Sequence, residues 1–233
     1  MYCYSINNGD DNMKVILMDI DDTLMDFKQC SYQAIKNALK QCGYMMNDDF
    51  FDKFTILNNQ LWKDYALGKI EKSVLLNIRW KILFKDNNIN VSDEGFDDIF
   101  QSQLGQQYVL IDGAEEMLAY LSSKYDVYVA SNGVLSGQIQ RLKLSGLYDY
   151  FKGMFVSEKI GYPKPKKEFF DYCLNELSCA KDEIMIIGDS LEADISGGIY
   201  AGIKTCWVNL KNESTDLNVD YEVHSLKEIR EFL

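Results

Sequence analysis

The sequence feature that most constrains the fold is a change from apolar to acidic residues near the amino terminus. The run over residues 14–19 is apolar between its ends, and an acidic turn follows with Asp21, Asp22 and Thr23. A short apolar run bounded by turn residues is typical of a strand that is buried on both faces of a parallel sheet. The acids then lie at the carboxyl end of the strand, where open α/β sheets bind their ligands. The sequence therefore predicts an α/β fold with a site at the end of its first strand.

Two of these carboxylates, Asp19 and Asp21, are separated by a single residue. Acids that face one small site repel each other unless a cation or a shared proton lies between them. The pair is therefore suited to hold a divalent metal and to transfer protons. On this stretch alone, a strand that merely ends in an acidic turn is the alternative.

The composition indicates a folded protein that does not bind nucleic acid. Of the 233 residues, 47% are apolar and 13% are aromatic, which is enough to bury a sizeable core. The net charge of −12 opposes binding to a polyanion, because backbone phosphates repel such a surface. A small anionic substrate remains possible if a metal and a few lysines make one pocket locally positive.

The sequence has no membrane or export signal that we can identify. No apolar run is long enough to cross a bilayer, and the amino terminus lacks a basic segment followed by an apolar one. The six cysteines have no CxxC spacing, which fits reduced thiols in a cytoplasm. We therefore expect a soluble cytoplasmic protein without a membrane partner, either a monomer or a homodimer.

A long segment after the first strand is predicted to be entirely helical. Apolar residues recur there at helical spacing in four groups, and Gly43, Gly68 and the pair Asn87 and Asn88 mark the stops between them. The segment is too long for an ordinary loop. We expect residues 27–107 to form a small helical bundle, a second domain inserted after the first strand.

The rest of the chain alternates between strands and helices, which predicts a parallel sheet covered by helices on both faces. Strands are expected at 127–130, 155–156, 184–187 and 206–208, and helices at 114–124, 135–144 and 167–177, then up to 201 and from about 225. The core domain would comprise residues 13–26 and 108–233. Residues 1–12 are expected to be a flexible polar lead-in.

Polar residues follow the predicted strands at several points. Ser131 and Asn132 follow one strand, and Asp189 follows another. Taken singly, the first pair could be only a turn and Asp189 only a helix cap. The carboxyl ends of parallel strands meet at one edge of the sheet, however, so these groups can converge with Asp19.

Lys164 lies between Pro163 and Pro165, the only two prolines in the chain. The following proline favours an extended backbone at Lys164, and the preceding one has a fixed φ. Such a stiff setting is suited to a lysine that points at a phosphate, with a rigid solvated turn as the alternative.

These motifs together resemble those of the haloacid dehalogenase-like (HAD) hydrolase superfamily. The matching residues are, in order, 19–23, Ser131 with Asn132, Lys164, and 188–190 with Asp194. The helical insert resembles the superfamily's C1-type cap, and the core would be its Rossmann-like parallel sheet. Residues 155–158, 169–172, 193–198 and 205–209 resemble one subgroup, the noncanonical pyrimidine 5'-nucleotidases.

The resemblance implies a role for each acid. Asp19 would attack phosphorus and form an aspartyl-phosphate, which splits one difficult displacement into two steps. Asp21 would protonate the leaving alcohol and then accept a proton from the hydrolytic water. Mg²⁺ would be held by Asp19, Asp189 and the backbone carbonyl of Asp21.

The resemblance also implies how the phosphoryl group would be bound. Ser131, the amides beside it at Asn132, and Lys164 would hold the phosphoryl oxygens and offset their charge. Asp194 would support the site from behind by positioning Lys164, and Thr23 would stabilise the turn after the nucleophile. Ser131 stands where the subgroup often has threonine, and the hydroxyl is kept.

Substrate contacts are expected from the insert. Trp62 or Tyr65 could stack on a base, and Arg79 lies on the next helix; packing within the bundle is the alternative for each. The single histidine, His224, lies near the carboxyl terminus and is given no catalytic role.

We therefore expect a Mg²⁺-dependent phosphomonoesterase that acts on nucleoside 5'-monophosphates, with pyrimidines preferred. The alternatives are a sugar-phosphate phosphatase or phosphomutase with the same core, and a non-catalytic metabolite-binding protein. Dehalogenation is disfavoured by Asp21, because the dehalogenases of the superfamily lack an acid at this position.

Overall fold

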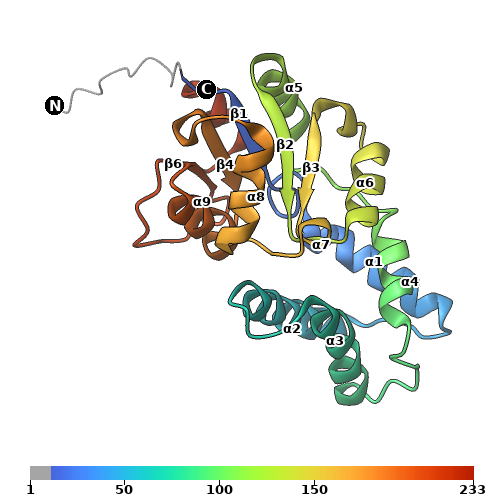
Figure 1. Ribbon diagram of the computed structural model, residues 1–233. Coiled ribbons are helices and arrows are strands. Elements are labelled where there is room, and N and C mark those ends of the chain that lie inside the picture. Colours follow the sequence, from blue (N-terminus) through green and yellow to red (C-terminus); the bar gives the residue numbers. More distant parts are fainter. Residues whose placement is uncertain (1–11) are drawn as a thin grey trace.

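The protein is built on a six-stranded parallel sheet with the strand order β3-β2-β1-β4-β5-β6 (Figure 1). The computed structural model describes residues 12–233 of the chain. The strands are β1 Val15–Met18, β2 Asp126–Ser131, β3 Gly153–Val156, β4 Ile184–Gly188, β5 Lys204–Val208 and β6 Tyr221–Val223. The predicted α/β fold with a parallel sheet is confirmed.

The register of the sheet brings the ends of its central strands together. β1 lies between β2 and β4, and Met18 pairs with Val129 on one side and with Ile187 on the other. The next residues of β1, β2 and β4 therefore reach the same edge of the sheet. Three loops that are far apart in the sequence start there side by side.

Both faces of the sheet are buried, which explains why the strands read as continuous apolar runs. Ile16 and Met18 belong to a cluster that includes residues of α5 (Ala114–Lys124) and Leu142 of α6 (Leu135–Leu144). The alternate residues Val15 and Leu17 belong to a cluster with α8 (Lys167–Leu177) on the opposite face. Successive side chains of a strand point to opposite faces, so each strand supplies both cores.

The insert consists of four helices, as predicted: α1 Phe27–Gln41, α2 Asp48–Ala66, α3 Lys72–Asp86 and α4 Phe96–Leu104. The side chains of Asp26 and Asn47 accept hydrogen bonds from backbone N–H groups at the starts of α1 and α2, each at 2.8 Å. The helices share their own apolar core, which is rich in aromatic residues such as Phe54, Trp80 and Phe100.

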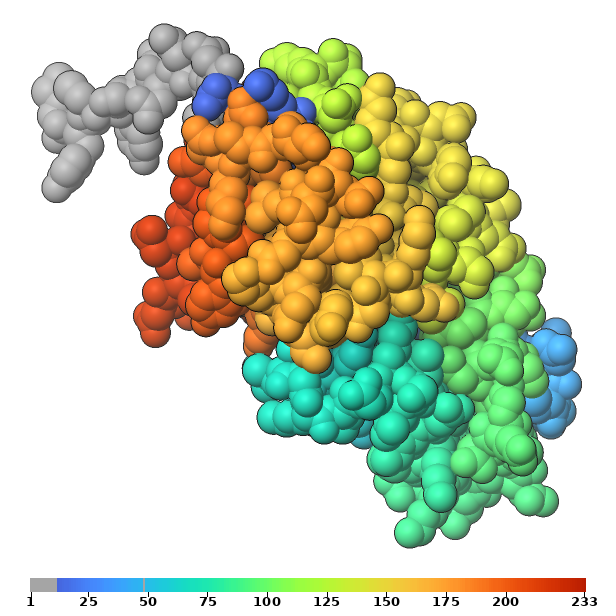
Figure 2. Space-filling view, viewed as in Figure 1, coloured from blue at the N-terminus to red at the C-terminus, as the bar shows by residue number. Residues whose placement is uncertain are grey.

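The insert lies over the carboxyl edge of the sheet. In Figure 1, α2 and α3 lie beyond the arrowheads of β2 and β3, and in Figure 2 they pack directly against the core. The chain enters and leaves the insert through adjacent segments: the backbone N–H of Asp26 donates to the carbonyl of Val109, and that of Ile111 donates to Leu24, both at 2.9 Å. The insert therefore covers the edge where the loops converge.

Several short elements differ from the expectations. The closing segment is a 3-10 helix, η4 (Leu226–Glu231), rather than an α-helix, and the segment before Ala201 is divided into a π-helical turn, η3 (Leu191–Ile195), and α9 (Ser196–Ala201). The hydroxyl of Ser196 donates to the carbonyl of Leu191 at 2.7 Å, which competes with regular α-helical bonding at this junction.

Other short elements were not predicted, because they span too few residues to show a periodicity. They are α7 (Ser157–Ile160), β6, and the 3-10 turns η1 (Tyr148–Tyr150) and η2 (Lys181–Glu183). In the described part of the chain no helix is long and apolar enough to cross a membrane. The expected flexible lead-in lies outside the described residues, apart from Asn12. The five cysteines from Cys30 onward are free thiols.

Candidate active site

The site is centred on the ammonium group of Lys164, which is buried at the carboxyl edge of the sheet. Its Nζ donates hydrogen bonds to Oδ1 of Asp19 at 2.7 Å, to Oδ1 of Asp194 at 2.6 Å, and to the carbonyl of Ala130. Only 1% of Lys164 is exposed. Three segments that are distant in the sequence are thus joined by one cation.

Burial and charge act in opposite directions on these groups. Burial alone would lower the pKa of Lys164, but the carboxylates of Asp19 and Asp194 outweigh it and raise that pKa above its usual value. Burial raises the pKa of Asp19 to about 7, although the Lys164 ammonium opposes this shift. Lys164 therefore remains charged, and it is the main group that favours ionised Asp19.

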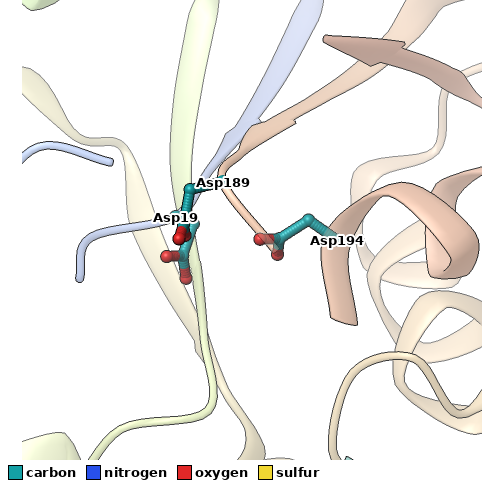
Figure 3. A group of neighbouring side chains, drawn as sticks. All are labelled: Asp19, Asp189 and Asp194. Atoms are coloured by element: carbon teal, nitrogen blue, oxygen red, sulfur yellow. The ribbon is translucent and has the colours of Figure 1, made fainter. Parts of the chain in front are cut away.

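A third carboxylate gives the site an excess of negative charge. Oxygen atoms of Asp19, Asp189 and Asp194 all lie within 4.8 Å of one another. Figure 3 shows Asp19 and Asp189 together, with Asp194 pointing toward them from the neighbouring helical turn. Burial raises the pKa of Asp189 well above its usual value, and the carboxylates of Asp19 and Asp194 raise it further. Bringing these acids together requires a cation in addition to Lys164 if all of them are to be ionised.

The donor set fits a hard divalent cation such as Mg²⁺, which prefers carboxylate oxygens. Asp194 is already engaged, because it accepts from Lys164 and, through Oδ2, from the backbone N–H of Ser190 at 3.2 Å. Asp19 and Asp189 are the residues best placed to bind a metal. The side chain of Asp21 is not part of this cluster.

Thr23 connects the loop of the nucleophile to the loop of Asp189. Its Oγ1 accepts a hydrogen bond from the backbone N–H of Asp189 at 3.0 Å and lies 3.4 Å from Oδ1 of the same residue. The indole Nε1 of Trp207 donates to the carbonyl of Asp189 at 2.9 Å. Thr23 was expected to stabilise its own turn, and in the structure its hydroxyl contacts Asp189.

Asp21 is held by two residues that sequence reasoning missed. Nη1 of Arg141 lies 2.5 Å from Oδ1 of Asp21, and Nε2 of Gln138 donates to its Oδ2 at 2.7 Å. Gln138 and Arg141 are three residues apart on α6, so they lie on the same face of the helix. The sequence does show two polar residues at this spacing on the helix after the Ser131 turn. Polar pairs of this kind are common on exposed helix faces, so the spacing alone does not indicate a site.

Ser131 and Asn132 make different contacts from each other. Oγ of Ser131 accepts from the backbone N–H of Gly133 at 3.0 Å and from Nε2 of Gln138 at 3.2 Å, and the residue lines the cavity. The side chain of Asn132 is bonded to the backbone of Lys164 at both ends: Nδ2 donates to its carbonyl and Oδ1 accepts from its N–H, each at 2.9 Å. The Asn132 side chain thus positions the Lys164 segment.

A cavity of about 710 Å³ extends from these residues to the insert. Asp19, Asp21 and Lys164 line it on the side of the core, and Trp62 and Arg79 on the side of the insert. Its size is in the range of cavities that bind small organic ligands.

The three insert residues singled out from the sequence are placed differently. Trp62 lines the cavity, and its ring makes an edge contact with the ring of Tyr65, with the centroids 5.7 Å apart. Tyr65 is not among the lining residues; it is 8% exposed and hydrogen-bonds to Ser157 in the core. Arg79 lines the cavity, but only 1% of it is exposed and it is paired with Asp97.

Two lysines of the insert contact the core directly, and neither was predicted. Nζ of Lys72 donates to the carbonyls of Asn132 at 2.9 Å and Gly133 at 2.7 Å. Lys63 forms an exposed ion pair with Glu192 at 2.5 Å. Lys72 therefore connects the start of α3 to the loop that contains the candidate phosphate-binding groups.

Comparison with known proteins gives consistent matches over almost the whole chain. The family model of the haloacid dehalogenase-like hydrolases matches residues 16–208. The pyrimidine 5'-nucleotidase PynA of Streptococcus pneumoniae is 36% identical over 225 residues, which cover 94% of each chain. The pyrimidine 5'-nucleotidase YjjG of Escherichia coli is 28% identical over 221 residues, which cover 94% of this chain and 96% of YjjG.

Among solved structures, the chain resembles the HAD-hydrolase YfnB of Bacillus subtilis. The orthorhombic crystal form of YfnB, bound to magnesium, aligns with a TM-score of 0.88 and 32% identity, covering 94% of this chain and 97% of YfnB. That structure is described as revealing an interdomain movement. The similarity includes both the sheet and the insert, because the alignment covers nearly the full length of each chain.

Proposed function

The chain belongs to the haloacid dehalogenase-like hydrolases, and on that premise we propose that it is a Mg²⁺-dependent phosphomonoesterase that hydrolyses nucleoside 5'-monophosphates, with pyrimidine nucleotides preferred. The observation that carries the proposal is the meeting of Asp19, Asp189 and Lys164 at one sheet edge, with Asp21 facing the same cavity. Relatives of similar length that are named pyrimidine 5'-nucleotidases support the substrate class.

In the first step the carboxylate of Asp19 attacks phosphorus. A bond forms between its oxygen and phosphorus, the ester bond to the nucleoside oxygen breaks, and the product is an aspartyl-phosphate. Lys164 favours the ionised form of Asp19 and orients its carboxylate, because it binds one oxygen of that group. The backbone N–H groups near Ser131 and the Lys164 ammonium offset the charge on the phosphoryl oxygens.

Asp21 transfers the protons in both steps. It protonates the departing 5'-oxygen, and in the second step it takes a proton from the water that attacks phosphorus and releases Asp19. Gln138 and Arg141 together bind both oxygens of Asp21. These two contacts hold the Asp21 carboxyl in one orientation at the edge of the cavity.

Mg²⁺, bound by Asp19 and Asp189, would supply positive charge beside the phosphoryl group and allow the clustered acids to be ionised together. The protein's own contribution is to fix these acids through Thr23, Trp207 and Lys164. Such support restricts the carboxylates to one arrangement before the substrate arrives.

A panel of phosphate esters tests the proposal, assayed for phosphate release with Mg²⁺ and with a chelator. The panel contains UMP, dUMP, dTMP, AMP, GMP, several sugar phosphates and an aryl phosphate. Mg²⁺-dependent release that is strongest with the pyrimidine nucleotides is the expected result. Release from sugar phosphates alone would contradict the nucleotide substrate. Conversion of an ester without phosphate release would indicate a phosphomutase instead of a phosphatase. No release from any ester would contradict catalysis.

A further inference from the structure

We propose that a buried polar cluster in the insert recognises the base of the nucleotide through the base's carbonyl oxygens. The cluster, called the distal cluster below, consists of Asn58 on α2, Arg79 on α3 and Asp97 on α4. The inference rests on the proposed function and names the residues that give it its base specificity. Asn58 is the residue that we expect to contact the base.

The distal cluster is an unusual feature within an aromatic core. Nη1 of Arg79 donates to Oδ1 of Asn58 at 2.8 Å, and Nη2 of Arg79 pairs with Oδ1 of Asp97. The indole Nε1 of Trp80 donates to the same oxygen of Asp97 at 2.7 Å. Asn58 and Arg79 are 2% and 1% exposed. Three helices thus bury an ion pair and an amide at a position where apolar side chains would pack at a lower cost in desolvation free energy.

The cluster retains hydrogen-bond donors that have no acceptor. Nε of Arg79 is buried and has no partner within the described residues. An arginine can only donate, so the carbonyl oxygen of Asn58 must face Arg79, and the amide Nδ2 is on its other side. Within residues 12–233 no acceptor for this Nδ2 is found, since the contact with Arg79 is the one hydrogen bond of the Asn58 side chain. The Nδ2 of Asn58, a residue that lines the cavity, is therefore the donor that an acceptor atom of a ligand would satisfy.

The cluster faces the cavity that contains the candidate nucleophile. Asn58 and Arg79 line this cavity together with Asp19 and Lys164. Asn58 and Trp62 are four residues apart on α2, so they lie on one face of the helix about one turn apart. A base that stacks on the Trp62 ring would present its polar edge to Asn58, while the phosphate lies at the opposite end near Lys164.

The charge of the cluster restricts which acceptor it would bind. Asp97 already balances Arg79, so the cluster as a whole is neutral. A second phosphate or a carboxylate would find no uncompensated cation here, whereas a neutral carbonyl oxygen matches the neutral amide donor of Asn58. Uracil, thymine and cytosine all carry such an oxygen. The cluster therefore favours a pyrimidine base over an acidic sugar or a bisphosphate.

The test compares UMP with ribose 5-phosphate, which lacks the base, in the wild type and in Asn58→Asp. The substitution replaces the amide donor by an acceptor while keeping a partner for Arg79. We expect kcat/KM for UMP to fall about 10-fold or more and kcat/KM for ribose 5-phosphate to be unchanged. The matched control is Asn77→Asp, which changes an exposed amide on α3 in the same way; within residues 12–233 that amide makes one hydrogen bond, to the carbonyl of Ser73.

The outcomes separate this inference from the proposed function. If the wild type prefers UMP and Asn58→Asp keeps the same preference, the distal cluster does not read the base although the function stands. If the wild type shows no preference for UMP over ribose 5-phosphate, the proposed substrate class fails and the inference with it. An equal loss with both substrates would assign Asn58 to the structure of the insert.

A second measurement needs no variant and so does not depend on the folding of Asn58→Asp. It uses the wild type with a UMP analogue whose base is replaced by a phenyl ring, which can stack but has no carbonyl. We expect kcat/KM to be about 10-fold lower or more for the analogue than for UMP. Equal values for the two would overturn the proposal.

Discussion

Nζ of Lys164 lies 2.7 Å from Oδ1 of Asp19, although the two residues are 145 positions apart in the sequence. The side chains are 2% and 11% exposed, so little water is available to replace either partner. Asp194 provides the second carboxylate for the same ammonium. Within the protein itself, this one ammonium is therefore the main group that favours the ionised form of the nucleophile.

Replacing Lys164 by methionine should abolish turnover and destabilise the metal-free protein. The substitution leaves Asp19 and Asp194 buried without their counter-charge, which typically costs about 3–5 kcal/mol. Urea unfolding in the presence of a chelator measures this change. The control is Lys167→Met, because the side chain of Lys167 is 75% exposed and its removal should have little effect. An unfolding midpoint for Lys164→Met equal to that of the control would contradict the pairing.

The stabilisation by Mg²⁺ should increase with pH. In the metal-free protein the pKa of Asp19, about 7, and the pKa of Asp189 are both above their usual values. These carboxyls bind protons more tightly in the folded state, so their contribution to stability is present at low pH and is lost as the pH rises through about 7. Mg²⁺ competes with those protons.

Differential scanning calorimetry with and without Mg²⁺ checks this expectation. The rise in Tm on adding Mg²⁺ should be larger at about pH 8 than at about pH 6. Asp189→Asn, which removes a candidate ligand, should lose most of the effect. A rise in Tm that is the same at both pH values would show that the metal does not displace protons from this cluster.

Asp21→Asn should slow nucleotide hydrolysis by about 10²- to 10⁴-fold, because the alkoxide of the nucleoside then leaves without a proton. An aryl oxide is a better leaving group and needs less assistance. Rapid-mixing experiments with an aryl phosphate should therefore give a burst of the phenol followed by slow turnover, since the variant lacks the base that Asp21 provides in the second step. A first step slowed equally for both esters would rule out the acid role.

A methyl group at Gly188 should displace the Asp194 side chain, which binds Lys164. A Cβ built on Gly188 would lie 2.3 Å from Oδ2 of Asp194 and 2.8 Å from its Cβ, so the Asp194 side chain would have to move away from Lys164. We expect Gly188→Ala to lose activity and to be destabilised by about 1–3 kcal/mol.

The matched control is Gly137→Ala on α6, where a Cβ would meet nothing within 4 Å. That substitution should be neutral or stabilising by up to about 1 kcal/mol, because alanine is the better helix former. Both changes are measured by urea unfolding. Similar unfolding curves for the two variants would contradict a tight contact between Gly188 and Asp194.

The sheet and the position of the site could be predicted from the sequence because both depend on local patterns. The apolar run that ends in Asp19 defines β1, and a parallel sheet brings the ends of its strands to one edge whatever the loops between them. The order of the motifs also predicted the family, and the matching family model confirms that prediction. The four helices of the insert were predicted from helical spacing and glycine stops in the same way.

The partners of Asp21 and of Arg79 could not be predicted, because they depend on how helices pack rather than on the periodicity of each helix. Arg141 looks like a surface residue of α6 until the helix is docked with that face against Asp21. Arg79 was considered as a substrate contact, with packing in the bundle as the alternative, and the sequence did not reveal that Asn58 and Asp97 bind its guanidinium from two other helices. Side-chain orientation across packed elements is the information that a single sequence lacks.

The central claim is that Asp19 becomes phosphorylated during turnover. Rapid acid quenching of the enzyme with Mg²⁺ and UMP labelled in the phosphate tests it directly. We expect covalently bound label that hydroxylamine removes, that maps to the peptide containing Asp19, and that Asp19→Asn lacks. Substantial phosphate release without any covalent label, in the wild type and also in Asp21→Asn, would contradict the aspartyl-phosphate mechanism.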